Sequence, residues 1–251
     1  MLLLLCMADV ILHKGIVRVM LPKKFPAAKI NNTAPPSNIQ LINTNKQWTK
    51  AVNTASILQT IDSLTAGVEI DVYFDLAKND FDVHHGTEPA FFYFNNWLQL
   101  YAKRKLTCSI WLDFKNLDAA NQQQALASVM RLSKSYGLKN KIVIESPYTD
   151  LLKPFAESGF FTSYYVPYFN PYLISNDSLL TCVRKINVAL KNSTVQSLSG
   201  YYYQASFLHH YFPRYYILTW GSNDWYSPAN LLFKKYVQQK KEILVALYPL
   251  G

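Results

Sequence analysis

Aliphatic and acidic side chains alternate along one β-branched stretch of the chain. Val68, Ile70 and Val72 alternate with Glu69 and Asp71. Side chains on a strand point alternately to its two faces, so this pattern predicts a strand with both carboxylates on one face. Two interpretations are open from this segment alone. The carboxylates face water if the strand is half-buried, whereas in a parallel barrel they converge on the axis and the aliphatic side chains face the helices.

A regular alternation of strand-like and helix-like segments begins at about residue 46. The predicted strands are residues 47–52, 67–74, 109–114, 141–145, 162–166, 195–202, 216–220 and 242–248, with a short extra strand at 80–83. The predicted helices between them are residues 55–64, 91–104, 119–136, 151–158, 177–190, 205–211 and 229–240. This count of elements is typical of an α/β fold, a single (β/α)8 TIM barrel. The helix after the last strand is missing, and the N-terminal segment is a candidate to cover that gap.

Residues 1–45 form an extension ahead of the predicted barrel domain at 46–251. The apolar run at residues 1–7 is followed by polar positions such as Asp9 and Lys14, and it is shorter than the roughly 20 residues that a membrane-spanning helix needs. Two alternatives stay open: a membrane anchor or export signal flanked by basic residues, or an element that packs on the barrel. Residues 31–37 are predicted to be a linker.

Composition agrees with one large, well-packed domain. The 251 residues are 50% hydrophobic and 16% charged, which gives enough apolar material for a barrel core. The net charge of +9 favours anionic partners such as phosphate-bearing substrates or a membrane surface. No nucleic-acid partner is expected, because no motif of a nucleic-acid-binding module accompanies the basic residues. Cys6, Cys108 and Cys182 lack the spacing of metal ligands or of a disulfide framework.

The acidic pair on the alternating strand is the leading candidate for a metal site. Glu69 and Asp71 would lie side by side, and two like charges at such a distance are costly unless a cation joins them. Asp113 and Lys115 share a face of a later predicted strand for the same period-two reason. In a barrel that face points inward.

A set of short motifs follows the predicted strands in a fixed order. These motifs are Lys50-Ala-Val-Asn53, Gly67-Val-Glu-Ile-Asp71, His85-Gly86, Leu112-Asp-Phe-Lys115 and Thr219-Trp220. The order resembles the glycerophosphodiester phosphodiesterase and phosphatidylinositol-phospholipase-C-like barrels over roughly residues 46–250. The His-Gly pair and the Asp-x-Lys motif are similar to the sphingomyelinase D branch of that superfamily.

This resemblance implies a role for each matching residue. Glu69, Asp71 and Asp113 match the metal-binding carboxylates, Lys115 matches the lysine that contacts the phosphate, and His85 matches the second catalytic histidine. Carboxylates are hard oxygen ligands, which suit Mg²⁺ or Ca²⁺. The alternative is that lysine side chains neutralise the carboxylates and no metal binds.

Position 50 departs from the family pattern. The family's first catalytic histidine opens a His-x-Val-Asn motif, and here Lys50 takes its place while Val52 and Asn53 are kept. Imidazole exchanges protons near neutral pH, whereas a lysine beside carboxylates is expected to stay charged and to be a poor base. Lys50 is able instead to form an ion pair with the carboxylates.

Two hypotheses about function follow. In the first, the protein is a metal-dependent phosphoric diester hydrolase that acts on a glycerophosphodiester or a phospholipid headgroup, with His85, Lys50 and Lys115 at the catalytic positions. In the second, Lys50 makes it a pseudoenzyme that keeps the barrel as a binding module. Localisation is open, with membrane anchoring or export as candidates.

Further residues near the strand ends are candidates for binding the substrate. Aromatic rings there can hold a quaternary ammonium or sugar headgroup, although core packing explains most of them. The candidate substrate-binding residues are Asn53, Trp220, Tyr201 and Tyr203. Glu145 is a candidate for a further acid or ligand. In the His84-His85 pair only one ring is able to face the site, and His209-His210 is interpreted as structural.

Overall fold

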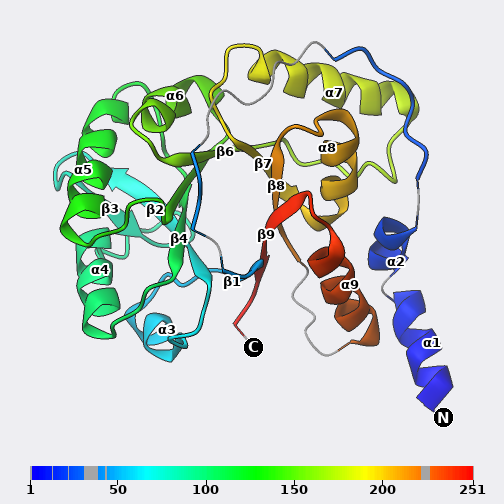
Figure 1. Ribbon diagram of the computed structural model, residues 1–251, viewed down its shortest axis with the longest axis horizontal. Helices are drawn as coiled ribbons and strands as arrows, with labels where there is room; N and C mark the ends of the chain where they lie inside the picture. Colours follow the sequence, from blue (N-terminus) through cyan, green and yellow to red (C-terminus); the bar gives the residue numbers. More distant parts are fainter. Residues whose placement is uncertain are drawn as a thin grey trace.

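Parallel strands close into a barrel with helices around it (Figure 1). The computed structural model describes residues 2–12, 14–21, 23–30, 39–42, 44–221 and 227–250, and the predicted linker at 31–37 lies outside them. The barrel strands within these residues are β1 (Gln47–Thr49), β2 (Gly67–Asp75), β4 (Ser109–Phe114), β5 (Ile142–Ser146), β6 (Phe161–Tyr165), β7 (Ser197–Tyr201), β8 (Tyr216–Trp220) and β9 (Ile243–Tyr248). Strand β1 pairs with both β2 and β9, which closes the sheet. The predicted TIM barrel is confirmed.

Helices connect the barrel strands in the predicted order. They are α3 (Ala55–Thr60), α4 (Phe94–Lys103), α5 (Gln122–Ser135), α6 (Thr149–Glu157), α7 (Asn176–Leu190), the 3₁₀ turn η1 (Tyr202–Gln204) with α8 (Ala205–Tyr211), and α9 (Pro228–Gln239). The largest difference at a single helix end is at α3, which ends four residues before the predicted residue 64. The Asp62 carboxylate accepts a hydrogen bond from the Leu64 amide at 2.7 Å, and such a local turn competes with helix.

The short strand β3 (Asp80–Val83) pairs antiparallel with the outer end of β2, as predicted for residues 80–83. This hairpin returns the chain to the barrel, where the His84 amide donates to the Asp71 carbonyl at 3.1 Å. The next residue, His85, is therefore placed close to the acidic pair on β2.

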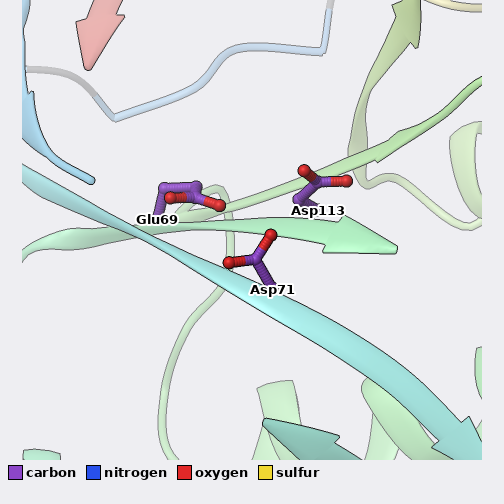
Figure 2. A group of neighbouring side chains, drawn as sticks. All are labelled: Glu69, Asp71 and Asp113. Carbon is purple, nitrogen blue, oxygen red and sulfur yellow. The ribbon is translucent and has the colours of Figure 1, made fainter. Parts of the chain in front are cut away.

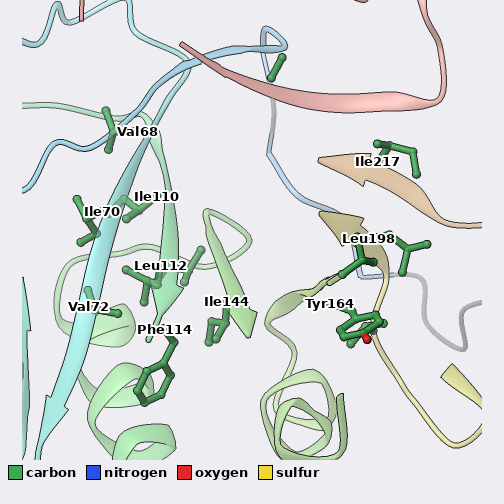
Figure 3. Close-up of a cluster of buried hydrophobic side chains, with 14 of the residues drawn as sticks. Val68, Ile70, Val72, Ile110, Leu112, Phe114, Ile144, Tyr164, Leu198 and Ile217 are labelled. Carbon is green, nitrogen blue, oxygen red and sulfur yellow. The ribbon is translucent and has the colours of Figure 1, made fainter. Parts of the chain in front are cut away.

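The two faces of each barrel strand pack into different layers. Val68, Ile70 and Val72 face outward and are fully buried against the helices (Figure 3). Glu69 and Asp71 face the barrel interior and are also buried, at 2% and 3% exposure. This arrangement decides between the two interpretations of the alternating strand, because neither face meets water. The barrel interpretation is confirmed.

An apolar layer fills the amino-terminal half of the barrel interior. It consists of Trp48, Trp111, Val143, Phe161, Leu218, Val245 and Leu247. Ile39 and Leu41, from the segment ahead of β1, pack against this layer. The space toward the carboxyl ends of the strands therefore has a dry floor.

The N-terminal helices α1 (Leu2–Leu12) and α2 (Lys14–Met20) lie at the edge of the molecule (Figure 1). Both contact α9, and α2 also contacts η1, with Ile16 and Val19 buried. Because η1 and α9 flank β8, these helices lie on the β8 side of α9, away from α3. The expectation that the N-terminal segment covers the gap after the last strand is therefore wrong for the described residues. No helix among those residues is long and apolar enough to cross a bilayer.

The contact between Gly67 and Trp48 provides a test of the packing at the barrel floor. A Cβ atom at Gly67 would lie 2.0 Å from Cδ2 of Trp48, whose side chain is almost fully buried. We expect Gly67→Ala to lower the free energy of unfolding by about 2 kcal/mol or more, measured by urea denaturation. In a Trp48→Leu background the same change should cost less than about 1 kcal/mol. An equal cost in both backgrounds would contradict this packing.

Candidate active site

A cavity of about 180 Å³ lies at the carboxyl ends of the barrel strands. Its lining residues are Lys50, Glu69, Asp71, His85, Trp111, Asp113, Lys115, Glu145, Tyr165, Trp220 and Leu247. The structure thus brings together all six residues predicted for catalysis and metal binding. This end of a TIM barrel is where its enzymes carry their active sites.

Three carboxylates converge on the barrel axis in this cavity (Figure 2). Glu69 and Asp71 come from β2, and Asp113 lies directly beside Asp71 on the neighbouring strand β4. One oxygen of each lies within 4.8 Å of the others. Within the described part of the chain this is the one acidic or histidine-rich group with such spacing. Three hard oxygen donors at this separation fit a divalent cation such as Mg²⁺ or Ca²⁺.

Burial makes this cluster costly without a cation. Burial, reinforced by the charges of Asp71 and Asp113, raises the pKa of Glu69 to about 8. Burial likewise raises the pKa of Asp113, although Lys115 opposes the shift. Glu145, from β5, is fully buried, and burial together with Asp113 holds its pKa well above the usual range. A positive ion in the cavity would therefore stabilise groups that are otherwise hard to ionise.

Lys115 already supplies part of that positive charge. Its Nζ lies 2.7 Å from Oδ1 of Asp71 and also contacts Oδ2 of Asp113. Burial by itself lowers the pKa of Lys115, but the two aspartates outweigh it and the pKa is raised. Lys50 lines the cavity and forms no ion pair within 4.0 Å with a described residue. The ion pair considered for Lys50 is thus made by Lys115.

The loop after β1 holds the β2 carboxylates in place. The Ala51 amide donates to Oε2 of Glu69 at 2.7 Å, and Ala51 has a positive φ of 58°, a conformation uncommon outside glycine. The Asn53 side chain donates to Oδ2 of Asp71 at 2.6 Å and accepts from the Asp71 amide at 2.9 Å. Asn53, predicted to bind substrate, does not line the cavity. Ala51 acts through its backbone amide, so no pattern of side chains in the sequence indicates its role.

The two adjacent histidines have different surroundings. His84 is buried and stacks on Tyr73, with ring centroids 4.2 Å apart, and its Nδ1 lies 3.4 Å from the Asp82 carboxylate. His85 is exposed and lines the cavity. Of the two, His85 is therefore the one that lines the cavity. His210, on α8, packs against Phe25, away from the carboxylates.

Aromatic rings form the wall of the cavity opposite β2. Tyr165 and Trp220 line it, with their ring centroids 5.5 Å apart. Tyr201 meets Trp220 edge-on at 6.0 Å, and Tyr203 is buried behind Tyr201 at 4.8 Å. Of the predicted substrate-binding residues, Trp220 therefore lines the cavity and the two tyrosines support it.

The sequence patterns did not single out two residues of the cavity floor, Trp111 and Leu247. Trp111 lies two positions before Asp113 on the same face of β4, so the period-two pattern contained a signal for it. Leu247 is one of many apolar residues in its strand and has no distinguishing signal.

A larger hollow of about 450 Å³ lies elsewhere, beside the loop that precedes β8. Its lining includes Ala27, Arg214 and Tyr215, but none of the converging carboxylates. By size alone the larger hollow would be the candidate active site. The acidic and lysine side chains of the smaller cavity favour the smaller cavity instead. We take the smaller cavity as the candidate active site because buried groups with shifted pKa values are typical of active sites.

No protein-family model matches the chain, and no curated protein matches its sequence. Its barrel is similar to solved structures assigned as glycerophosphodiester phosphodiesterases. The one from Silicibacter pomeroyi DSS-3 is 14% identical, covers 84% of this chain and 92% of its own, and gives a TM-score of 0.55. Those from Parabacteroides distasonis ATCC 8503 and Galdieria sulphuraria are 13% and 10% identical, cover 82% and 85% of this chain and 92% and 95% of their own, and give TM-scores of 0.52 and 0.54.

The chain therefore has the barrel fold of glycerophosphodiester phosphodiesterase structures, as the motif order implied. At this level of identity the likeness defines the fold and leaves the chemistry to the residues of the site. The similarity to the sphingomyelinase D branch stays a prediction.

Glu69→Gln tests whether the acidic cluster lowers the stability of the metal-free fold and whether it binds a metal ion. The amide keeps an acceptor for the Ala51 N–H and removes the buried charge. The pKa of Glu69 in the folded chain, about 8, lies above its ordinary value of 4.5, so native stability falls as pH rises through this interval. We expect the metal-free variant to exceed the native protein in stability by about 2 kcal/mol at pH 9 and by little at pH 5.

The same variant should lose most of the rise in melting temperature that Mg²⁺ or Ca²⁺ gives the native protein. Asp62→Asn, a change at an acidic residue outside the cavity, serves as the control. If Glu69→Gln is no more stable than Asp62→Asn at pH 9, the Glu69 carboxylate is not destabilised by its burial and the neighbouring charges.

Proposed function

We propose that this protein is a metal-dependent phosphoric diester hydrolase that acts on a glycerophosphodiester or a phospholipid headgroup. One observation carries the proposal: the buried Glu69 and Asp71, the half-buried Asp113, two lysines and a histidine converge in one cavity at the carboxyl ends of the barrel strands. The similarity of the fold to glycerophosphodiester phosphodiesterase structures supports it.

Glu69, Asp71 and Asp113 are the residues that would hold the metal ion. When bound, a divalent cation neutralises phosphoryl oxygens and orients the diester. The Ala51 amide and the Asn53 side chain fix the carboxylate oxygens of Glu69 and Asp71, so two of the three ligands are preorganised.

Two ammonium groups face the same space and suit an anionic diester. Lys115 is shared between Asp71 and Asp113, so its charge is largely balanced. Lys50 has no such partner among the described residues and is the cation available to a phosphate group. In this proposal Lys50 helps to bind the phosphate, as an imidazole at this position would. It does not transfer protons as an imidazole does.

His85 is the residue proposed to transfer a proton. It is the one histidine among the cavity-lining residues, and its exposure lets it exchange protons with solvent. Imidazole is suited to giving a proton to the leaving oxygen near neutral pH. The substrate headgroup would contact Trp220 and Tyr165, since a volume of about 180 Å³ has room for a phosphate and a small headgroup but not for acyl chains.

The alternative is a pseudoenzyme that binds a phosphodiester without cleaving it. The ion pairs of Lys115 favour this alternative, because they neutralise Asp71 and Asp113 without a metal. The lysine at position 50 favours it as well, because a second proton-transfer group is missing from that position. Hydrolysis measurements separate the two.

His85→Ala tests the catalytic proposal directly. Native protein should hydrolyse at least one member of a panel of glycerophosphodiesters and lysophospholipids in Mg²⁺ or Ca²⁺, and EDTA should abolish the reaction. We expect His85→Ala to lower kcat by about 100-fold, the usual effect of losing a proton-transfer group. His210→Ala, a histidine outside the cavity, should leave kcat unchanged. Binding without any hydrolysis by the native protein would support the pseudoenzyme instead.

Lys50→His tests whether a second imidazole is what limits the rate. Restoring a proton-transfer group at this position should raise kcat by about 100-fold. Lys50→Gln removes the charge without adding an imidazole and should raise KM without raising kcat. If Lys50→His is no faster than Lys50→Gln, the position takes no part in proton transfer.

A further inference from the structure

An exposed apolar surface begins on the N-terminal helix. Asp9 is the one polar residue of α1. Large side chains of α1 are between 37% and 81% exposed at Leu3, Leu4, Leu5, Met7, Val10, Ile11 and Leu12. Single exposed apolar side chains are ordinary, but a contiguous group of this kind marks an interaction surface.

This helix lies against the first turn of α9, on the outer side of the barrel. The Asp9 carboxylate accepts a hydrogen bond from the Ala229 amide, in the first turn of α9, at 2.8 Å. Helix α9 follows the carboxyl end of β8, so its first turn lies at the end of the barrel where the cavity opens. Helix α2 contacts η1, which directly follows the carboxyl end of β7. Figure 1 shows α1 and α2 along the outer side of α9.

Further exposed apolar residues lie on α9 and on other connections at the carboxyl end of the barrel. Leu231 and Leu232 are exposed in the second turn of α9, close to its contact with α1. The connections that leave the barrel at its carboxyl end carry exposed Phe91, Tyr148 and Tyr168. Tyr168 also contacts Tyr201 edge-on, which joins this rim to the aromatic wall of the cavity. These apolar residues therefore belong to the same end of the barrel as the cavity.

Basic side chains lie beside this surface. Residues 1–30 contain a single acidic residue, Asp9, whose carboxylate is occupied by the α9 amide. Arg18 on α2 and Lys235 on α9 are exposed. Lys235 lies one helical turn after Leu231, so both project from one face of α9. Apolar side chains bordered by cations are complementary to an anionic lipid surface, where acyl chains lie beneath negative headgroups.

The length of α1 fits one leaflet. Its 11 residues span about 16 Å, roughly half of the hydrocarbon core of a bilayer. We propose that α1 and the exposed leucines of α9 insert into the interface of an anionic bilayer and turn the cavity mouth toward the lipid headgroups. The substrate would then be a membrane phospholipid. That last step rests on the proposed function, whereas binding to the membrane does not.

Vesicle sedimentation with the full chain tests the inference. Native protein should sediment with phosphatidylcholine vesicles that contain about one third phosphatidylglycerol, and Leu4→Glu/Leu12→Glu should lower the partition coefficient at least about tenfold. The matched control is Leu64→Glu, which changes a leucine that is 90% exposed before β2, at the opposite end of the barrel. This control should bind like the native protein. Arg18→Glu/Lys235→Glu should weaken binding to the anionic vesicles about tenfold and change binding to pure phosphatidylcholine little.

Two results would overturn the inference. One is vesicle binding that Leu4→Glu/Leu12→Glu lowers no more than Leu64→Glu does. The other is absent vesicle binding together with self-association, seen by light scattering, that the double variant abolishes, because a second copy of the chain then covers the surface.

Activity on two substrates separates this inference from the proposed function. The leucine double variant should slow hydrolysis of phospholipid in vesicles at least about tenfold and leave hydrolysis of a water-soluble glycerophosphodiester unchanged. Equal effects on both substrates would contradict delivery by the membrane. Specific vesicle binding without hydrolysis of either substrate would refute the hydrolase and leave the membrane surface in place.

Discussion

The site depends on one constraint: three carboxylates, two of them buried and the third half-buried, converge on a single axis where water stabilises their charges poorly. The barrel imposes this by placing Asp71 and Asp113 on neighbouring strands in register. Lys115, the Asn53 amide group and the Ala51 amide all act on that excess of negative charge. Even so, the pKa of Glu69 stays raised, to about 8, because burial outweighs these contacts. This incompletely balanced negative charge favours the binding of a cation by the cluster.

The alternation of strand-like and helix-like segments predicted the barrel, and within a barrel the period-two pattern of β2 directs its acids inward. β2 has aliphatic and acidic residues in strict alternation, and its two faces meet helices on one side and the axis on the other. Strand periodicity also placed Lys115 inward, but it did not say which lysine pairs with the aspartates. That choice depends on side-chain reach: Lys115 directly follows β4 beside its partners, whereas Lys50 arrives from β1.

Contacts between distant segments were beyond prediction from the sequence. Asn53 was expected at the substrate because its motif resembles the family's, yet both ends of its amide contact Asp71. The placement of α1 and α2 rests on contacts with α9 and η1, more than 180 residues later in the chain. Neither helix has a periodicity that specifies these partners. His85, by contrast, was selected from the sequence because its His-Gly pair resembles the family's motif, and the β2–β3 hairpin does carry it back to Asp71.

The apolar floor of the barrel limits how molecules enter and leave the site. Trp48, Trp111 and Phe161 close the interior from below, and Ile39 packs beneath them. The cavity is thus closed at its base, and a molecule that enters must leave through the same opening. Under the proposed function, a diester cleaved there would yield two products that share one exit, so the smaller fragment would have to leave past the larger or after it. For the proposed hydrolase, this shape would make release of products, rather than bond cleavage, the step that the barrel controls.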